Sequence, residues 1–298
     1  MGRDFYDAYP AARAVFDEAD AILGRPLSRI VFEGPEEDLT HTRNSQTGIF
    51  VMSMALLAVI HEEFPSLRPS VCAGLSLGSN TAVTASGRMT FATCLPLVQD
   101  RGAFMNDACE AHPGQMAVVM GLEAEAVESI VEACALPHDL WAANFNCPGQ
   151  VVVSGTAKGI EAFTAAAKAA GAKRVLPLQV HGAFHSGLMQ DAQDRLAPKV
   201  QAASIDASPV ELVMNVPGGF VADTAQIRAH LIDQVTSPVR WQQGIQAMEA
   251  RGVDLYIEIG PGKTLAGMNK RIKTSAPTVS IERVGDLELL RQEIFKLV

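Results

Sequence analysis

Ser76 lies in a segment that could turn its hydroxyl into a nucleophile. The segment reads Gly74-Leu75-Ser76-Leu77-Gly78 and follows an apolar run that begins at Val71. The pattern G-x-S-x-G between a strand and a helix is typical of a nucleophile elbow, in which a sharp turn exposes the serine hydroxyl. Glycines on either side remove side chains that would clash in such a turn. We expect the Leu77 amide, at the start of the following helix, to be free to bind an oxyanion.

A serine nucleophile needs a base, and the chain has seven histidines. His181 and His185 lie together just after an expected strand, where parallel α/β sheets place their sites. Most loop histidines are ordinary surface or core residues. The position after a strand nevertheless favours a role as the base, for His185 first and for His181 second. Their H-x-x-x-H spacing does not indicate a metal site, because no glutamate lies between them and Gly182 disfavours a helix. We therefore expect no metal.

Arg101 lies among apolar residues of a helix expected over Thr90 to Cys109. An arginine in such a position is usually solvated or paired with an acid. The alternative is a buried guanidinium that holds a substrate carboxylate through two parallel hydrogen bonds. The residue itself leaves both interpretations open.

The segment Gly260-Pro261-Gly262-Lys263-Thr264 is similar to the end of a phosphate-binding loop. In the motif G-x-x-x-x-G-K-[ST] the first glycine would fall at Ile257, so the spacing fails. We therefore predict a structural turn between a strand and a helix.

The elements around these residues alternate between strands and helices. Apolar spacing predicts a central helix over Gln46 to Glu63 and a buried strand over Val71 to Leu75. Residues 112–181 follow the order β-α-β-β-α-β of a ferredoxin-like unit. We predict an α/β fold: residues 1–111 and 182–298 form a discontinuous domain with a hydrolase-like parallel sheet and helices on both faces, and 112–181 form an inserted ferredoxin-like subdomain.

Composition excludes several classes of protein. Of the 298 residues, 48% are hydrophobic and 19% are charged, as in ordinary soluble proteins. The net charge of −9 argues against binding to nucleic acid or to an anionic membrane, although Lys270, Arg271 and Lys273 could meet an acidic partner. The longest apolar stretch, Met54 to Ile60, is too short to span a bilayer. Five widely spaced cysteines indicate reduced thiols, so we expect a cytoplasmic protein.

Six motifs, in order, resemble those of the malonyl-CoA:acyl carrier protein transacylases of fatty acid synthesis and the acyltransferase domains of polyketide synthases. The resemblance covers nearly the whole chain, and several motifs in the right order are far more specific than any one of them. The matching segments are Gly74 to Gly78, Gln99-Asp100-Arg101-Gly102, Asn146 to Gly155, Gly182-Ala183-Phe184-His185-Ser186, Ser237-Pro238-Val239-Arg240-Trp241 and Glu258 to Lys263.

The resemblance implies a ping-pong transfer. Ser76 would attack the thioester of malonyl-CoA with His185 as general base, and the malonyl group would pass to the phosphopantetheine thiol of acyl carrier protein. Arg101 would pair with the malonyl carboxylate, and the ring of Phe184 would exclude an α-methyl group. The main-chain carbonyl of Gln234 would orient the histidine. No cofactor beyond these two substrates is implied, and we expect a monomer.

The chain departs from the family's pattern in two places. Family members normally begin with a strand and a Gly-Gln-Gly-Ser-Gln loop, whereas this chain begins at the later segment Met1-Gly2-Arg3-Asp4. We therefore expect the first strand and one backbone donor of the oxyanion hole to be missing. After the elbow, Ser79-Asn80 replaces a usual Glu-Tyr pair, a change that the sequence does not explain.

Three other functions stay open from the sequence. A serine thioesterase or other hydrolase would share the elbow but would have no use for a carboxylate-binding arginine. An acyltransferase of a polyketide pathway would share every motif. A catalytically weak subunit that binds the carrier protein would fit the missing loop and the change at Ser79-Asn80.

Overall fold

Five helices occupy the first part of the chain in the computed structural model, which describes residues 1–297. They are α1 (Arg3–Ala8), α2 (Pro10–Leu23), α3 (Leu27–Glu33), α4 (Glu36–Thr40) and α5 (Thr42–Glu63). Helix α2 begins at Pro10, which suits the first helical position, and it ends before Gly24, which takes a left-handed φ of 62°. The short helices α1, α3 and α4 were not predicted.

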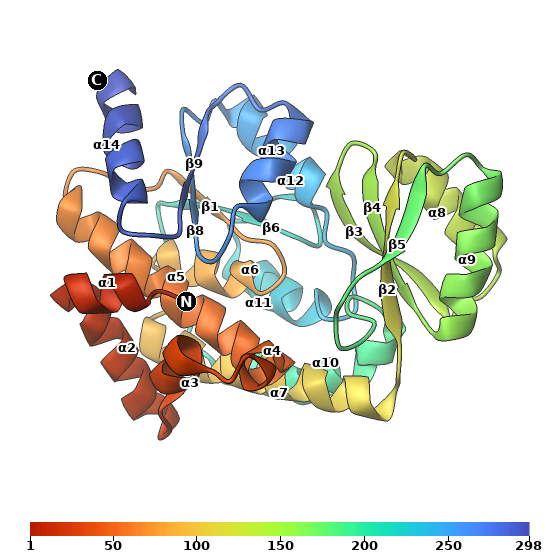
Figure 1. Cartoon of the computed structure of the whole chain (residues 1–298), viewed down its shortest axis with the longest axis horizontal. Helices are drawn as coiled ribbons and strands as arrows, with labels where there is room; N and C mark the ends of the chain where they lie inside the picture. The colour runs from red at the N-terminus through yellow and green to blue at the C-terminus, as the bar shows by residue number, and fades with distance from the viewer. Residues whose placement is uncertain (298) are drawn as a thin grey trace.

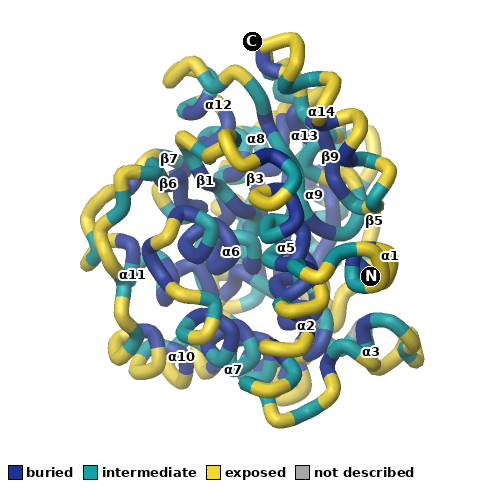
Figure 2. The backbone as a smooth tube through the Cα atoms, turned by 90° about the vertical axis from the view of Figure 1, so that its left-hand side faces the viewer, coloured by how far each residue is buried: buried dark blue, intermediate teal, exposed yellow. Residues whose placement is uncertain are grey.

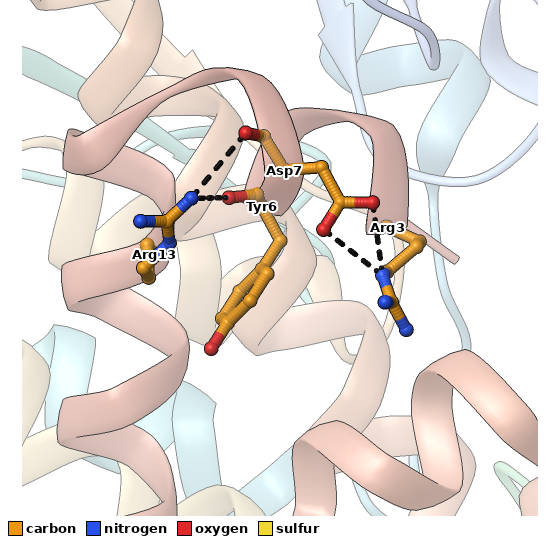
Figure 3. A network of polar contacts seen from close by, with 4 residues as sticks. All are labelled: Arg3, Tyr6, Asp7 and Arg13. Carbon is orange, nitrogen blue, oxygen red and sulfur yellow. Dashed lines mark hydrogen bonds and ion pairs between the residues drawn. The ribbon is translucent and has the colours of Figure 1, made fainter.

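Polar contacts on the surface lie within α1 and between α1 and α2 (Figure 3). The Nε atom of Arg3 donates to both carboxylate oxygens of Asp7, at 3.1 and 3.0 Å. The Nη2 atom of Arg13 donates to the carbonyls of Tyr6 and Asp7, at 3.3 Å each. Exposed contacts of this kind contribute little to stability, so buried Phe5 supplies most of the anchoring of α1.

The larger unit of the structure contains two small sheets and most of the helices (Figure 1). Its strands are β1 (Val71–Ala73), β6 (Glu211–Met214), β7 (Gly219–Phe220), β8 (Tyr256–Ile259) and β9 (Thr278–Ile281). Its remaining helices are α6 (Gly78–Ala85), α7 (Phe91–Ala111), the 3₁₀ turn η1 (Gly187–Met189), α10 (Gln190–Ala202), α11 (Thr224–Asp233), α12 (Trp241–Arg251), α13 (Thr264–Ile272) and α14 (Asp286–Leu297).

The sheets of this unit are covered on both faces, as predicted. Along β1, Cys72 packs into the core formed with α5, α6 and α7, whereas Val71 and Ala73 face the cluster that includes α12 and α13. This alternation follows from the two-residue period of a strand. The dark tube of α5 runs through the interior in Figure 2.

The parallel strands fall into two sheets instead of one. Strand β1 pairs in parallel with β6, and β8 pairs in parallel with β9, in separate sheets. Strand β7 adds an antiparallel edge to β6 that was not predicted. The α/β class with a hydrolase-like core is therefore confirmed, with its parallel pairs split between two sheets.

The smaller unit has the ferredoxin-like order of elements. Its members are β2 (Gln115–Met120), α8 (Ala124–Ala133), β3 (Leu140–Cys147), β4 (Gln150–Gly155), α9 (Ala157–Ala169) and β5 (Arg174–Pro177), and the sheet order is β3-β4-β2-β5. Helices α8 and α9 cover its outer face, away from the larger unit (Figure 1). Two backbone hydrogen bonds of 2.8 Å between Val239 and β3 join this sheet to the larger unit.

Helix α5 is long and apolar enough to cross a membrane by length and composition alone. However, 67% of its most apolar window is buried inside the protein. Such burial is the expected property of a core helix, and α5 packs against α2 and α7.

Candidate active site

The elbow forms a tight turn between β1 and α6. Ser76 has a φ of 52°, a left-handed conformation that a residue with a side chain rarely adopts. A Cβ on Gly74 would lie 2.0 Å from the backbone of Gly78, so only glycine fits at that position. Among the described residues, four that are not glycine have positive φ, and Ser76 and His185 are two of them. Such conformations cluster at functional sites, because the surrounding structure must hold them in place.

His185 meets Ser76 from the loop between β5 and η1. Its Nε2 atom lies 2.9 Å from Ser76 Oγ, and its Nδ1 atom lies 2.7 Å from the carbonyl oxygen of Gln234 at the end of α11. A carbonyl can only accept, so Nδ1 carries the proton and Nε2 accepts from the Ser76 hydroxyl. The resemblance implied this carbonyl in place of an acid, and the structure puts it at hydrogen-bond distance.

The surroundings of His185 keep its ring neutral. The side chain is 3% exposed, and burial, assisted by the positive charge of Arg101, lowers its pKa from 6.5 to about 4. A neutral imidazole at physiological pH can accept the serine proton. His181, the second histidine considered, is exposed, and its ring lies 6.4 Å from that of His41. The described hydrogen-bond partners of the Ser76 hydroxyl are His185 and Arg101, and His181 is not one of them.

Arg101 reaches the same hydroxyl from α7. It is 2% exposed, and its Nη2 atom donates to Ser76 Oγ at 3.1 Å. Burial lowers the pKa of this guanidinium to about 10. No described carboxylate forms an ion pair with it, and its Nε atom is buried without a partner. The interpretation of Arg101 as a solvated or salt-bridged residue is therefore wrong, and a buried cation without a counter-ion faces the nucleophile.

Gln46 is a site residue that the sequence did not single out. It lies on α5, is 8% exposed, and its Oε1 atom accepts a short hydrogen bond from Arg101 Nη1. Its Nε2 atom lies 3.5 Å from the sulfur of Met105. The amide thus orients the guanidinium without neutralising it. One polar residue in an apolar helix gives no local signal of this role.

The Leu77 amide is available as an oxyanion donor. The neighbouring amides of Ser76, Gly78 and Ser79 all donate to protein acceptors. No acceptor for the Leu77 amide is found among the described residues, and Leu77 precedes the first turn of α6. An amide at a helix N-terminus beside the nucleophile can stabilise negative charge.

Phe184 lies between the two units. It is half-buried and packs against Met116, Val118 and Val152 on the inner face of the small sheet. Its carbonyl accepts a hydrogen bond of 2.5 Å from Ser154 Oγ on β4. The small sheet therefore fixes the backbone just before His185.

The unusual pair after the elbow stabilises the turn. Ser79 Oγ donates to the Gly74 carbonyl at 3.1 Å, and Asn80 Nδ2 donates to the Leu77 carbonyl at 3.3 Å. Both residues are buried. Their small polar side chains thus bond within the elbow and do not reach the catalytic side chains.

The second glycine-rich turn is not an anion site. Carboxylates of the chain itself already accept from the amides at the start of α13: Glu258 accepts from Leu265 and Ala266 at 2.8 and 3.1 Å, and Glu282 accepts from Gly262 at 2.9 Å. The prediction of a structural turn is confirmed.

The arrangement of nucleophile, base, oxyanion donor and buried cation suits acyl transfer, and the comparisons decide the family. The model of the acyl transferase domain matches residues 1–288. The chain belongs to this family. It is 40% identical over 295 residues to the malonyl CoA-acyl carrier protein transacylase of Bacillus subtilis, which covers 99% of this chain and 92% of that protein. The Escherichia coli K12 protein of the same name is 37% identical over 272 residues, 91% and 88% of the two chains.

Solved structures agree with this assignment. The acyl carrier protein S-malonyltransferase of Vibrio cholerae superposes with a TM-score of 0.92 at 36% identity, covering 97% of this chain and 94% of that one. A type II polyketide-synthase malonyl-transacylase, solved in complex with its acyl carrier protein, gives 0.91 at 34% identity, covering 97% and 93%. The acyltransferase family and its two-unit fold are therefore shown for this chain.

Proposed function

We propose that this protein transfers a malonyl group from malonyl-CoA to the phosphopantetheine thiol of acyl carrier protein, in fatty acid synthesis in the cytoplasm. One observation carries the choice of acyl group: no carboxylate of the described residues pairs with buried Arg101, whose Nη2 atom lies 3.1 Å from Ser76 Oγ. A carboxylated acyl group would supply the missing negative charge at the right distance.

In the first half of the proposed reaction, Ser76 Oγ gives its proton to His185 Nε2 and attacks the thioester carbonyl. The Leu77 amide stabilises the oxyanion, and the Gln234 carbonyl stabilises the protonated ring. The C–S bond then breaks, and the CoA sulfur leaves with the proton from His185. The product is a malonyl ester on Ser76.

The second half repeats these steps with a different thiol. The phosphopantetheine thiol gives its proton to His185, the sulfur attacks the ester, and Ser76 recovers its proton. Lys270, Arg271 and Lys273 are exposed and form no ion pair with the described carboxylates, which suits an acidic carrier protein. A malonyl-transacylase that is 34% identical to this chain has been solved in complex with its acyl carrier protein.

The test measures transfer directly. The protein is mixed with malonyl-CoA and phosphopantetheinylated acyl carrier protein, and malonylated carrier is quantified by intact mass. We expect rapid transfer that Ser76→Ala lowers by roughly 10⁴-fold or more, because the covalent route is lost. Release of free malonate without carrier protein, unaffected by Arg101→Ala, would instead support a thioesterase. Carrier binding without any acyl-enzyme would support a non-catalytic subunit.

A further inference from the structure

Asn215 follows the last residue of β6 and binds the elbow on both sides of Leu75. Its Oδ1 atom accepts from the Ser76 amide at 2.7 Å, and its Nδ2 atom donates to the Gly74 carbonyl at 2.8 Å. The side chain is 4% exposed, so water does not compete for these bonds.

These two bonds continue the pairing of two parallel strands. Ala73 pairs with Val213, so the same register would place Asn215 opposite Leu75. In a parallel ladder, a residue bonds with the carbonyl before and the amide after the residue that it faces. Here the backbone carbonyl of Asn215 accepts from the Arg240 amide at 3.0 Å instead, and its side-chain amide takes the ladder position.

We propose that Asn215 is the positioning residue that holds the nucleophile in its left-handed turn. By occupying the Ser76 amide, it leaves the Leu77 amide as the oxyanion donor of the elbow. Through its carbonyl it also ties β6 to the segment that follows Gln234, the residue whose carbonyl orients His185. Asn215 thus contacts the elbow through its side chain and the segment after Gln234 through its backbone carbonyl. The inference rests on Ser76 as the nucleophile of the proposed function, and it does not depend on which acyl group is transferred.

The main test is the reactivity of Ser76 toward a small serine-directed fluorophosphonate, which needs neither malonyl-CoA nor carrier protein. Asn215→Leu keeps the number and branching of the side-chain heavy atoms and removes both hydrogen bonds. We expect the rate of labelling and kcat of transfer to fall roughly 10²-fold, since small misplacements of a reacting group have effects of this size. KM for malonyl-CoA should change less than about threefold, because Arg101 is untouched.

The matched control is Asn269→Leu, on α13. Asn269 is 3% exposed, and its amide donates to Thr278 Oγ1 on β9 at 3.0 Å. This variant should lose thermal stability but keep the labelling rate of the folded protein. Labelling of folded Asn215→Leu at the rate of the Asn269→Leu control would overturn the proposal.

Two further measurements cover the case in which Asn215→Leu does not fold. In Asn215→Asp only the protonated carboxyl can both donate to Gly74 and accept from Ser76, so its labelling rate relative to wild type should rise as the pH falls from 8 to 6. A flat ratio contradicts the proposal. Amide hydrogen exchange in the unmodified protein should be slow at Ser76 and faster at Leu77, and equal rates would also contradict it.

Discussion

Two glycine-rich turns in this protein connect a parallel strand to a helix, and only one of them can do chemistry. After β1, the elbow presents the Ser76 hydroxyl to His185 and Arg101, and within residues 1–297 the Leu77 amide has no acceptor. After β8, the amides at the start of α13 bond with the carboxylates of Glu258 and Glu282.

The difference shows what glycine spacing does and does not determine. Glycines permit the backbone to turn sharply in both places. The chemistry then depends on whether side chains of the protein occupy the helix N-terminus or leave it open to a ligand. At the elbow, the charge beside the nucleophile is the buried cation of Arg101, whereas at the second turn two carboxylates accept from the amides.

Apart from loss of Ser76 itself, the largest expected effect comes from removing the cation at the open turn. Arg101→Met keeps much of the volume, and kcat/KM for malonyl-CoA should fall roughly 10²- to 10³-fold, because a buried charge partner of the substrate is lost. The same variant should unfold at a higher temperature than wild type, since a desolvated charge without an acid is removed.

Steady-state kinetics and calorimetry check the two expectations together. Arg101→Lys is the matched control, because it keeps the charge but not the bidentate hydrogen bonding. Its activity should lie between those of the wild-type protein and Arg101→Met. An Arg101→Met protein that is both less stable and fully active would show that the arginine is structural.

The second expected effect concerns the pH dependence of the base. Because burial and Arg101 hold the pKa of His185 near 4, kcat/KM should stay flat from pH 8 to about 5 and fall with a midpoint near 4. The contribution of His185 to the free energy of unfolding changes with pH in the same direction as the activity. The folded pKa lies below the ordinary 6.5, so this contribution is complete above pH 6.5 and is lost as the pH falls toward 4.

The pH–rate profile of the free enzyme tests this directly. Arg101→Met should move the midpoint upward, because the positive charge beside the ring is gone. A midpoint near 6.5 in the wild-type protein would mean that the ring is solvated, in disagreement with the site described above.

The smallest expected effect is at the closed turn. Glu258→Gln replaces one carboxylate oxygen by an amide that cannot accept from Ala266, and it removes the negative charge at the start of α13. We expect the free energy of unfolding to fall by about 1–2 kcal/mol, with transfer activity within about threefold of wild type. Urea unfolding and the transfer assay measure the two quantities. A loss of activity much larger than this would show that the second turn also takes part in the reaction.

Local patterns predicted the elements whose signals lie close together in the sequence. The apolar spacing of α5 and α7 and the order of strands and helices along the smaller unit follow from neighbouring residues. The short helices α1, α3 and α4 were missed because fewer than two full turns carry too little periodicity.

The supports of the site could not be predicted from local patterns, because their partners are distant in the chain. Gln46 and Arg101 are 55 positions apart, and Ser76 and Asn215 are 139 positions apart. The placement of Arg101 beside Ser76 was expected only through the family resemblance, since an isolated arginine on a helix is usually solvated. The two-sheet arrangement of the parallel strands likewise depends on contacts that no single segment encodes.

The most direct test of the central claim is the intact mass of the protein after brief mixing with malonyl-CoA in the absence of carrier protein. The site described here predicts a single malonyl adduct, mapped by peptide sequencing to Ser76, absent in Ser76→Ala and discharged when phosphopantetheinylated carrier protein is added. An unmodified mass, or an adduct that survives in Ser76→Ala, would contradict the assignment of Ser76 as the acyl-carrying nucleophile.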